Sequence, residues 1–385
     1  MNSKERVAAA FDGRPADKTP ICHISCSSAV ASKLLGREAY IGFGIQAWRE
    51  ATALWNGPDA HAEFVERTYR DTFAVNEIFE NDILRFDYGG HPRKPTKRLD
   101  EHTFLYEYGD EFEWQILRHD PDHEHINTVF PLHPKPPLEL DDLEAHVEAA
   151  EKSLGDYRPT VAADDPRNFG VRARRELGDR FVIRTGGAGV NIPRDPAWLM
   201  AAALKPEVVG RHLDVRTEQS IRAARPKVEL GFRYFFGGGD FAGNSGPMYS
   251  PKIFHELVLP RLQRLSEGFH AMGAKWLFAS DGDLWPVAED LFGASGVDGF
   301  YEIDGDCNME LPRLRERFPD LALVGNISSR RLHRGTRDDV IRQTLGCMEA
   351  AKKYKGIVVG VSNMIMPDSP IENVEAMIRT IHDNR

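Results

Sequence analysis

Short apolar runs alternate with longer segments of helical periodicity from about residue 181 to the end of the chain. Most of these runs lead into Gly, Asp, Ser or Asn, which is typical of strands that end in loops. The runs predict six strands: FVIRTGG (181–187), GFRYFFGGG (231–239), AKWLFAS (274–280), VDGFYEI (297–303), LALVGN (321–326) and GIVVGV (356–361). Helices are predicted between and after them, at 196–224 with a break near Pro206, 251–272, 284–294, 309–318, 336–353 and 370–383. Strands that alternate with crossover helices run parallel.

Two further apolar runs, TPICHIS (19–25) and NDILRFDYG (81–89), precede this block and bring the predicted strands to eight. Eight βα units favour an α/β fold of the (β/α)8 TIM-barrel type over an open sheet. The chain begins with an amphipathic segment, predicted as a helix with Ser3 as its cap and Gly13 as its end.

We therefore predict a single domain over 1–385, in which residues 1–80 are an N-terminal helical extension plus the first strand. The stretch 91–140 breaks the βα rhythm with two proline-rich arms. It is predicted to be a β-hairpin insertion that covers one end of the barrel.

Composition and charge narrow the function. The chain is 41% hydrophobic and 28% charged, with no apolar run near the ~18 residues that a membrane span requires. The N-terminus does not resemble a secretory signal, and four scattered cysteines do not form a disulfide framework. A net charge of −10 disfavours nucleic-acid binding, which needs a basic face. We expect a cytoplasmic protein that acts on small molecules.

Catalytic groups in such barrels lie at the carboxyl ends of the strands. The polar residues expected there are His23, Asp82, Arg85, Arg184, Asp240, Asn244, Asp281, Asp283, Glu302, Asn326 and Asn363. So many carboxylates cannot all stay ionised in one crevice without a metal, bound cations or raised pKa values. Their clustering is the main argument from the residues for an active site.

Four segments of the C-terminal half carry a family resemblance: GDFAGNSGPMYSPKIFHELVLPRL (239–262), SDGDLWPVAEDL (280–291), LVGNISSRRLHRGT (323–336) and VSNMIMPDSPIENVEAMI (361–378). In this order they resemble the uroporphyrinogen decarboxylase (URO-D) superfamily, which also includes corrinoid- and thiol-linked methyltransferases. The resemblance implies a (β/α)8 barrel and a homodimer. It also implies that Asp82, in the setting Phe79 to Leu84, occupies the place of the decarboxylase's essential aspartate.

The chain departs from both branches of the resembled superfamily. The segment HISCSSAVASKLLG (23–36) lacks the arginines that the decarboxylase has after its first strand, and Asn363 replaces a histidine on the last strand. At the zinc-ligand positions of the methyltransferases stand Ala279, Asp281 and Asn363. A thiolate zinc site needs Cys or His there and is not expected. Whether another metal binds stays open.

Structural roles compete with these functional interpretations. Asp82 could cap a helix or pair with Arg85, and either Asp281 or Asp283 could cap the helix predicted at 284–294. His23 could line the pocket, but neighbouring residues of a strand face opposite sides, so Cys22 should point away from it. Asn326 could orient the substrate or simply stand in a tight turn.

The leading hypothesis is an enzyme that transfers a methyl group from a small substrate to a corrinoid or similar acceptor, with a corrinoid protein as a candidate partner. Asp82, Asp281 and Asp240 are the expected catalytic carboxylates, and the other strand-end residues are expected to bind substrate. The alternatives are a decarboxylase acting on a pyrrole or another acid, and a non-catalytic barrel that binds a small molecule.

Overall fold

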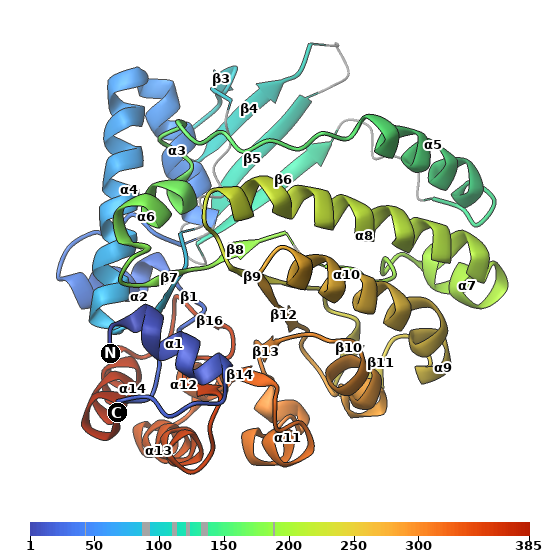
Figure 1. Cartoon of the computed structure of the whole chain (residues 1–385). Helices are drawn as coiled ribbons and strands as arrows, with labels where there is room; N and C mark the ends of the chain where they lie inside the picture. Colours follow the sequence, from blue (N-terminus) through green and yellow to red (C-terminus); the bar gives the residue numbers. More distant parts are fainter. Residues whose placement is uncertain (43, 87–92, 110–113, 121–123, 132–137, 188) are drawn as a thin grey trace.

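Parallel strands close into a ring in the computed structural model, which describes the chain except for residues 43, 87–92, 110–113, 121–123, 132–137 and 188 (Figure 1). The strands are β1 (Ser25–Cys26), β2 (Ile83–Leu84), β7 (Val182–Ile183), β8 (Thr185–Gly186), β9 (Tyr234–Gly238), β12 (Lys275–Ala279), β13 (Gly299–Tyr301), β14 (Ala322–Val324), β15 (Ile357–Val358) and β16 (Met364–Ile365). β2 pairs with β7, and β8, β9, β12, β13, β14 and β15 pair in chain order. The bridge Ile21↔Val359 and a 2.8 Å hydrogen bond from the Asp82 N–H to the Ile21 carbonyl close the ring. The predicted (β/α)8 barrel is confirmed.

Helices cover the outside of the ring. They are α7 (Pro196–Leu204), α8 (Pro206–Glu229), α9 (Pro251–Ile253) running through the π-helical turn η1 (Phe254–Val258) into α10 (Leu259–Ala271), the short turns η2 (Trp285–Val287) and η3 (Glu289–Ala294), α11 (Leu311–Arg317), α12 (Ser329–Arg334), α13 (Arg337–Lys353) and α14 (Ile371–Asn384). The predicted break at Pro206 is present, because this proline begins α8. Among the described helices, none is long and apolar enough to cross a membrane.

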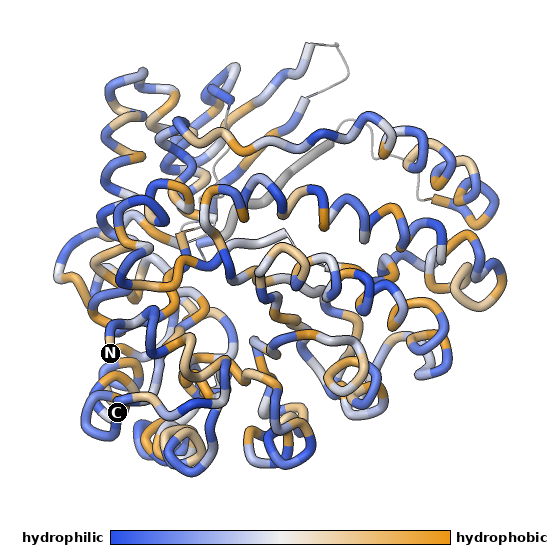
Figure 2. The backbone as a smooth tube through the Cα atoms, in the orientation of Figure 1, coloured by the Kyte–Doolittle hydropathy of each residue, from blue (hydrophilic) through white to orange (hydrophobic). Residues whose placement is uncertain are grey.

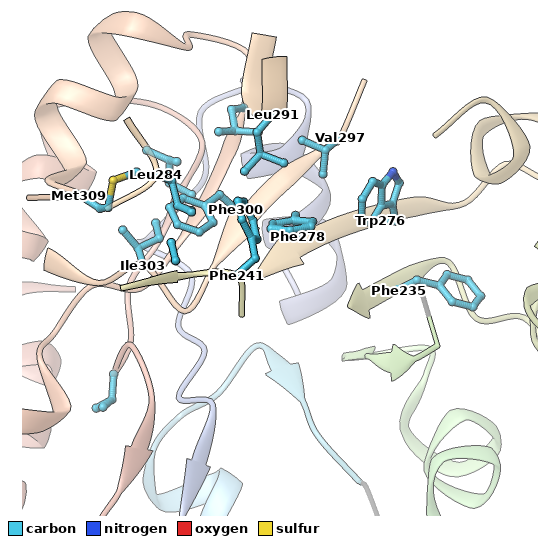
Figure 3. Close-up of a cluster of buried hydrophobic side chains, with 14 of the residues drawn as sticks. Phe235, Phe241, Trp276, Phe278, Leu284, Leu291, Val297, Phe300, Ile303 and Met309 are labelled. Carbon is cyan, nitrogen blue, oxygen red and sulfur yellow. The ribbon is translucent and has the colours of Figure 1, made fainter. Parts of the chain in front are cut away.

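Two apolar layers hold the barrel together. Alternate strand residues face inward, including Cys22, Ile83, Phe236 and Leu277, and form a cluster inside the ring. The intervening residues face the helices, and Figure 3 shows part of this outer layer, with Phe278 and Phe300 at its centre. In Figure 2, hydrophobic and hydrophilic stretches alternate along the helices, as expected for helices that pack on one face.

The first helix closes the amino end of the barrel. α1 (Ser3–Phe11) places Val7, Ala10 and Phe11 in the interior cluster. Its N-cap is Asn2 and not the expected Ser3, because the Asn2 side chain accepts a hydrogen bond from the Glu5 N–H. With this end filled, the open end of the barrel is the carboxyl end.

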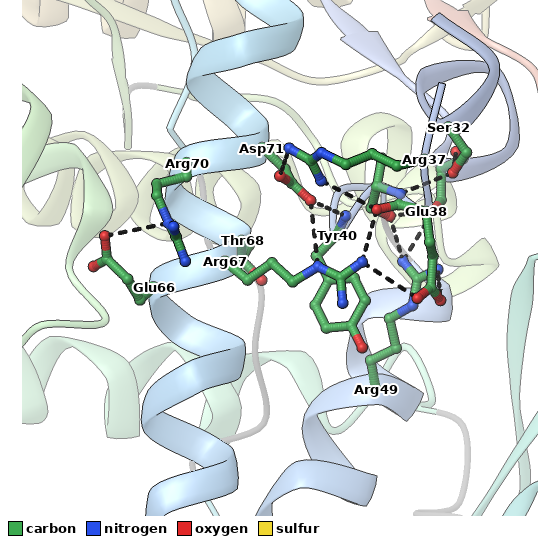
Figure 4. A network of polar contacts seen from close by, with 12 residues as sticks. Ser32, Arg37, Glu38, Tyr40, Arg49, Glu66, Arg67, Thr68, Arg70 and Asp71 are labelled. Carbon is green, nitrogen blue, oxygen red and sulfur yellow. Dashed lines mark hydrogen bonds and ion pairs between the residues drawn. The ribbon is translucent and has the colours of Figure 1, made fainter. Parts of the chain in front are cut away.

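The predicted N-terminal extension contains three more helices, α2 (Ser28–Leu35), α3 (Gly44–Asn56) and α4 (Pro58–Ile78). A network of ion pairs joins the loop after α2 to α3 and α4 (Figure 4). In it Arg37 pairs with Asp71 at 2.6 Å, and Arg49 pairs with Glu38 at 3.0 Å. These ion pairs hold the loop after α2, α3 and α4 together as one unit.

The expected hairpin insertion is larger in the structure. It is a four-stranded antiparallel sheet of β3 (Lys97–Arg98), β4 (Thr103–Glu107), β5 (Trp114–Asp120) and β6 (His125–Pro131), which packs on α3. Between β5 and β6, the Glu124 carboxylate accepts a 3.0 Å hydrogen bond from the Ser28 N–H, just after β1. The sheet thus reaches the carboxyl end of the barrel. Two helices, α5 (Leu143–Asp156) and α6 (Phe169–Leu177), follow it.

Candidate active site at the carboxyl end of the barrel

Two of the expected catalytic carboxylates lie side by side where β9 and β12 end. The Asp240 carboxylate accepts a 3.2 Å hydrogen bond from the Asp281 N–H. Gly238, with φ +124°, permits this approach, because a Cβ there would lie only 2.3 Å from the Ala279 carbonyl oxygen. The close pairing of the two strands therefore brings the two aspartates together.

Asn363 reaches the same carboxylates from the opposite side of the ring. Its side-chain N–H donates to the Asp281 carboxylate at 3.3 Å, while its side-chain oxygen accepts from the Met364 N–H at 2.7 Å. The second bond fixes the orientation of the amide. Asp281 is therefore held between the β9 loop and the loop after β15.

Burial changes the acidity of two groups in this cluster. Desolvation, together with the neighbouring carboxylates of Asp240 and Asp304, raises the pKa of Asp281 to about 6. Desolvation also raises the pKa of Glu302 to about 7, against the opposing effect of two arginines. Both groups therefore retain protons at pH values where ordinary carboxyl groups are ionised.

Glu302 has an unusual backbone conformation. Its φ is +58°, in the left-handed region that side chains other than glycine rarely adopt. The residue directly follows β13 and precedes the buried Ile303. Such strain persists only where the surroundings hold it, and it is concentrated at functional sites.

Two arginines face this acidic cluster. Arg184, between β7 and β8, is only 6% exposed, and its guanidinium lies over the rings of Phe236 and Tyr301, at 4.8 and 5.7 Å from their centres. Arg85, directly after β2, acts together with Arg184 to lower the pKa of Glu302. The end of the barrel is thus basic on the side of β2 and β7 and acidic on the side of β9 to β13.

Asp82 does not belong to this cluster. It precedes β2, so it lies at the amino end of its strand, and it is fully buried. Its carboxylate accepts hydrogen bonds from the Arg6 guanidinium at 2.6 Å, from the Ile21 N–H at 2.8 Å, and from Arg385. The structure contradicts the expected catalytic position of Asp82 and supports a structural one. Asp87, which the sequence run 81–89 predicts near the end of the same strand, lies outside the described residues.

Two other expected substrate-binding residues are also turned away. The His23 ring packs on Phe79 of the helical layer at 4.8 Å, and its Nδ1 accepts from the Val361 N–H, because strand alternation points Cys22 into the barrel instead. The Asn326 amide donates to the carbonyls of Ile303 and Met309. These expectations are therefore corrected: His23 packs against the helices and Asn326 holds the loop after β13.

Asp283 and Asn244 lie on the loops at this end but make structural contacts. The Asp283 carboxylate accepts from the Trp285 N–H at 3.0 Å, where the η2 turn begins. The N-cap of that turn is Leu284, so Asp283 makes a local structural contact beside the cap and does not occupy the expected capping position. Asn244 stands in the short hairpin of β10 (Ala242–Gly243) and β11 (Gly246–Pro247), where its oxygen accepts from the Cys307 thiol.

We expect the substitution Asp283→Ala to lower the free energy of unfolding by about 1 kcal/mol, because the first N–H of the η2 turn loses its acceptor. Turnover should change little. Denaturant unfolding measures the first quantity. A variant of unchanged stability that has lost its activity would instead place Asp283 in the chemistry.

The sequence reasoning missed the aromatic residues beneath Arg184. Phe236 and Tyr301 face inward and contact each other with ring centres 4.8 Å apart. Their inward direction follows from strand alternation once the ends of β9 and β13 are known. Both residues stand within their strands, so the search for polar groups beyond the strand ends passed over both.

The positions compared with zinc ligands have other contacts. Ala279 is part of the interior cluster, and Asp281 and Asn363 are hydrogen bonded to each other. Among the described residues, no group of three or more His, Cys, Asp or Glu side chains is arranged to hold a metal ion.

Comparisons with known proteins agree with this architecture. The family model described as uroporphyrinogen decarboxylase (URO-D) matches residues 194–384. A curated uroporphyrinogen decarboxylase of Anaeromyxobacter sp. (strain Fw109-5) is 27% identical over 130 residues, which cover 33% of this chain and 35% of that relative. The match thus spans only about a third of the relative.

A solved structure of a methyltransferase from Methanosarcina mazei superposes on the whole chain. It has a TM-score of 0.64 at 19% sequence identity and covers 100% of this chain and 99% of that one. At this identity the likeness concerns the fold. With the family match over the strands and loops that carry Asp240, Asp281, Glu302 and Asn363, these findings support membership of the uroporphyrinogen decarboxylase superfamily.

Proposed function

We propose that this chain is an enzyme that transfers a methyl group from a small substrate, with Asp281 as the acid that protonates the leaving group. The observation that carries the proposal is the pair of raised pKa values, about 6 for Asp281 and about 7 for Glu302, in one cluster. A general acid works best when its pKa lies near the working pH. The cluster meets that condition near neutrality.

The proposed reaction balances with one proton. The bond between the methyl carbon and its heteroatom breaks, its electron pair stays on the heteroatom, and the proton of Asp281 joins that atom. An acceptor supplies the electron pair of the new bond to the methyl carbon. The Asp240 carboxylate accepts a hydrogen bond from the Asp281 N–H, and the Asn363 amide donates one to the Asp281 carboxyl group. Both bonds hold the Asp281 side chain in position.

The acceptor that we propose is a corrinoid carried by a second protein. Asp240 and Asn363 are exposed, so this side of the cluster can be reached from solvent. The whole-chain likeness to a methyltransferase is in keeping with this choice. The arrangement supplies the leaving-group proton from the protein, and the corrinoid would supply the nucleophile.

A decarboxylase is the second candidate, because the curated relative that matches the C-terminal part is a uroporphyrinogen decarboxylase. The two reactions differ in what they consume and release. The purified protein is incubated with small methyl ethers, methylamines and methyl thioethers, each with cob(I)alamin, and methylcobalamin formation is followed by absorbance. In parallel it is incubated with uroporphyrinogen and small carboxylic acids without cob(I)alamin, and carbon dioxide is measured. Methyl uptake supports the proposal, and release of carbon dioxide without any acceptor would replace it by decarboxylation.

The pH dependence of the reaction follows from the same cluster. Because Asp281 must be protonated to act as an acid, and burial keeps it protonated to about pH 6, we expect kcat/KM to fall at higher pH. Above an apparent pKa between about 6 and 7, the decline should be about tenfold per pH unit. Initial rates between pH 5 and pH 9 measure it. Activity that rises through this range would make Asp281 a base.

A further inference from the structure

Arg184 is buried at the mouth of the barrel, and no acidic side chain among the described residues forms an ion pair with it. It is 6% exposed, and its Nη1 is buried without a hydrogen bond. Within the part of the chain that the structure describes, its guanidinium forms no ion pair, and its contacts are the faces of Phe236 and Tyr301. Glu302 lies close enough for the charge of Arg184 to lower its pKa, but no direct ion pair joins the two. A buried guanidinium with an unused donor is costly, and folded proteins rarely retain one without use.

Other buried arginines of this chain show the contrast. Arg6 pairs with Asp17 and Asp82, Arg49 pairs with Glu38, and Arg315 donates to four backbone carbonyls. Arg6 and Arg49 have carboxylate partners, and Arg315 has carbonyl acceptors for both of its terminal nitrogens, although its Nε has none. Arg184 differs from them, and it is also the one that lies beside the acidic cluster of the candidate active site.

We infer that Arg184 binds a carboxylate group of the substrate, so that the substrate is a small carboxylic acid. The planar guanidinium matches a carboxylate through two parallel hydrogen bonds. The rings of Phe236 and Tyr301 support it from below and fix its plane. This inference deepens the proposed function, because it names the class of the methyl donor.

The surrounding charges favour a carboxylate over a phosphate. A group with one negative charge is balanced by the single charge of Arg184, and a protonated Glu302, with a pKa raised by burial to about 7, can donate to it. A phosphate dianion would also face Asp240 and Asp281. The substrate would then span the site, with its carboxylate at Arg184 and its methyl group toward Asp281.

Ligand binding tests this inference without any turnover. Calorimetry compares acetate with acetamide, benzoate with benzamide, and phenyl phosphate as a further anion, all at neutral pH with the wild-type protein. We expect at least one carboxylate to bind more tightly than its neutral amide. The variant Arg184→Met should weaken that binding by about 10- to 100-fold, and Arg184→Lys by less, because lysine keeps the charge and loses the paired geometry.

Arg233→Met is the matched control, since it removes the same charge at the start of β9, at the amino end of the barrel, where its guanidinium donates to the carbonyls of Val228 and Phe232. It should leave carboxylate binding unchanged. Arg184→Met should also raise the melting temperature of the ligand-free protein, because an unpaired buried charge is removed.

Equal binding of acids and amides, tighter binding of phenyl phosphate, or unchanged binding in both Arg184 variants would overturn the inference. The result is independent of the reaction. If carboxylates bind through Arg184 but no methyl transfer is found, the inferred binding site is supported and only the proposed function is contradicted.

Discussion

Replacing Asp281 by asparagine should lower kcat/KM for the methyl donor by about 100- to 10,000-fold. The substitution keeps the size of the side chain and an oxygen that Asn363 can contact, but it removes the transferable proton. The residual activity should also lose its decline above pH 6. The measurement is a pH profile of initial rates for the variant and the wild type.

The control for this prediction is a substitution of Asp283, two residues after Asp281. Asp283→Asn removes the same charge from the same loop and retains an oxygen that can accept from the Trp285 N–H. We expect turnover close to that of the wild type. If Asp283→Asn lost as much activity as Asp281→Asn, the effect would come from the charge of the loop and not from a proton donor.

Asp82→Asn should lower the free energy of unfolding by about 3–5 kcal/mol, because Arg6 and Arg385 would share a buried site that has lost its central negative charge. The catalytic rate of the folded variant should remain near the wild-type value, since Asp82 lies at the closed end of the barrel. Denaturant unfolding and the rate at low temperature measure the two quantities separately.

The matched control substitution is Asp12→Asn, at the end of α1, the helix that carries Arg6. Asp12 pairs with Arg14 at 3.0 Å, and both side chains are exposed, so the loss should be within about 1 kcal/mol. An Asp82→Asn protein that is as stable as the wild type but inactive would restore the catalytic role that the family resemblance implied.

The fold could be predicted from the sequence because strand runs and helical segments alternate with regular spacing. The break at Pro206 and the barrel strands β7, β8, β9, β12, β13, β14 and β15 follow directly from that pattern. The four-stranded sheet after β2 did not follow, because its strands depend on packing against α3, with Phe104 and Tyr106 in a small core of their own. Local patterns do not encode that contact.

The candidate site could be predicted only where a residue stands beyond the end of its strand. Asp240, Asp281 and Glu302 do so, and the charges of Asp240 and Asp281 act on the carboxyl group of Glu302. The prediction for Asp82 was wrong because this residue precedes β2 by one position. It therefore lies at the amino end of the barrel, opposite the end that carries the other carboxylates. The prediction for His23 was wrong because its side chain points outward to the helices. Successive residues of a strand face opposite sides, so an error of one position in the alternation reverses the predicted side.

The most direct test of the account needs no substrate. Infrared spectroscopy records the carbonyl band of protonated carboxyl groups as the pH is raised from 4 to 9, in the wild type, Asp281→Asn and Glu302→Gln. We expect a band that persists to between pH 6 and pH 7 in the wild type and is reduced in each variant. A wild-type band that has disappeared by pH 5 would show that the cluster holds no proton to donate, and would contradict the proposed chemistry.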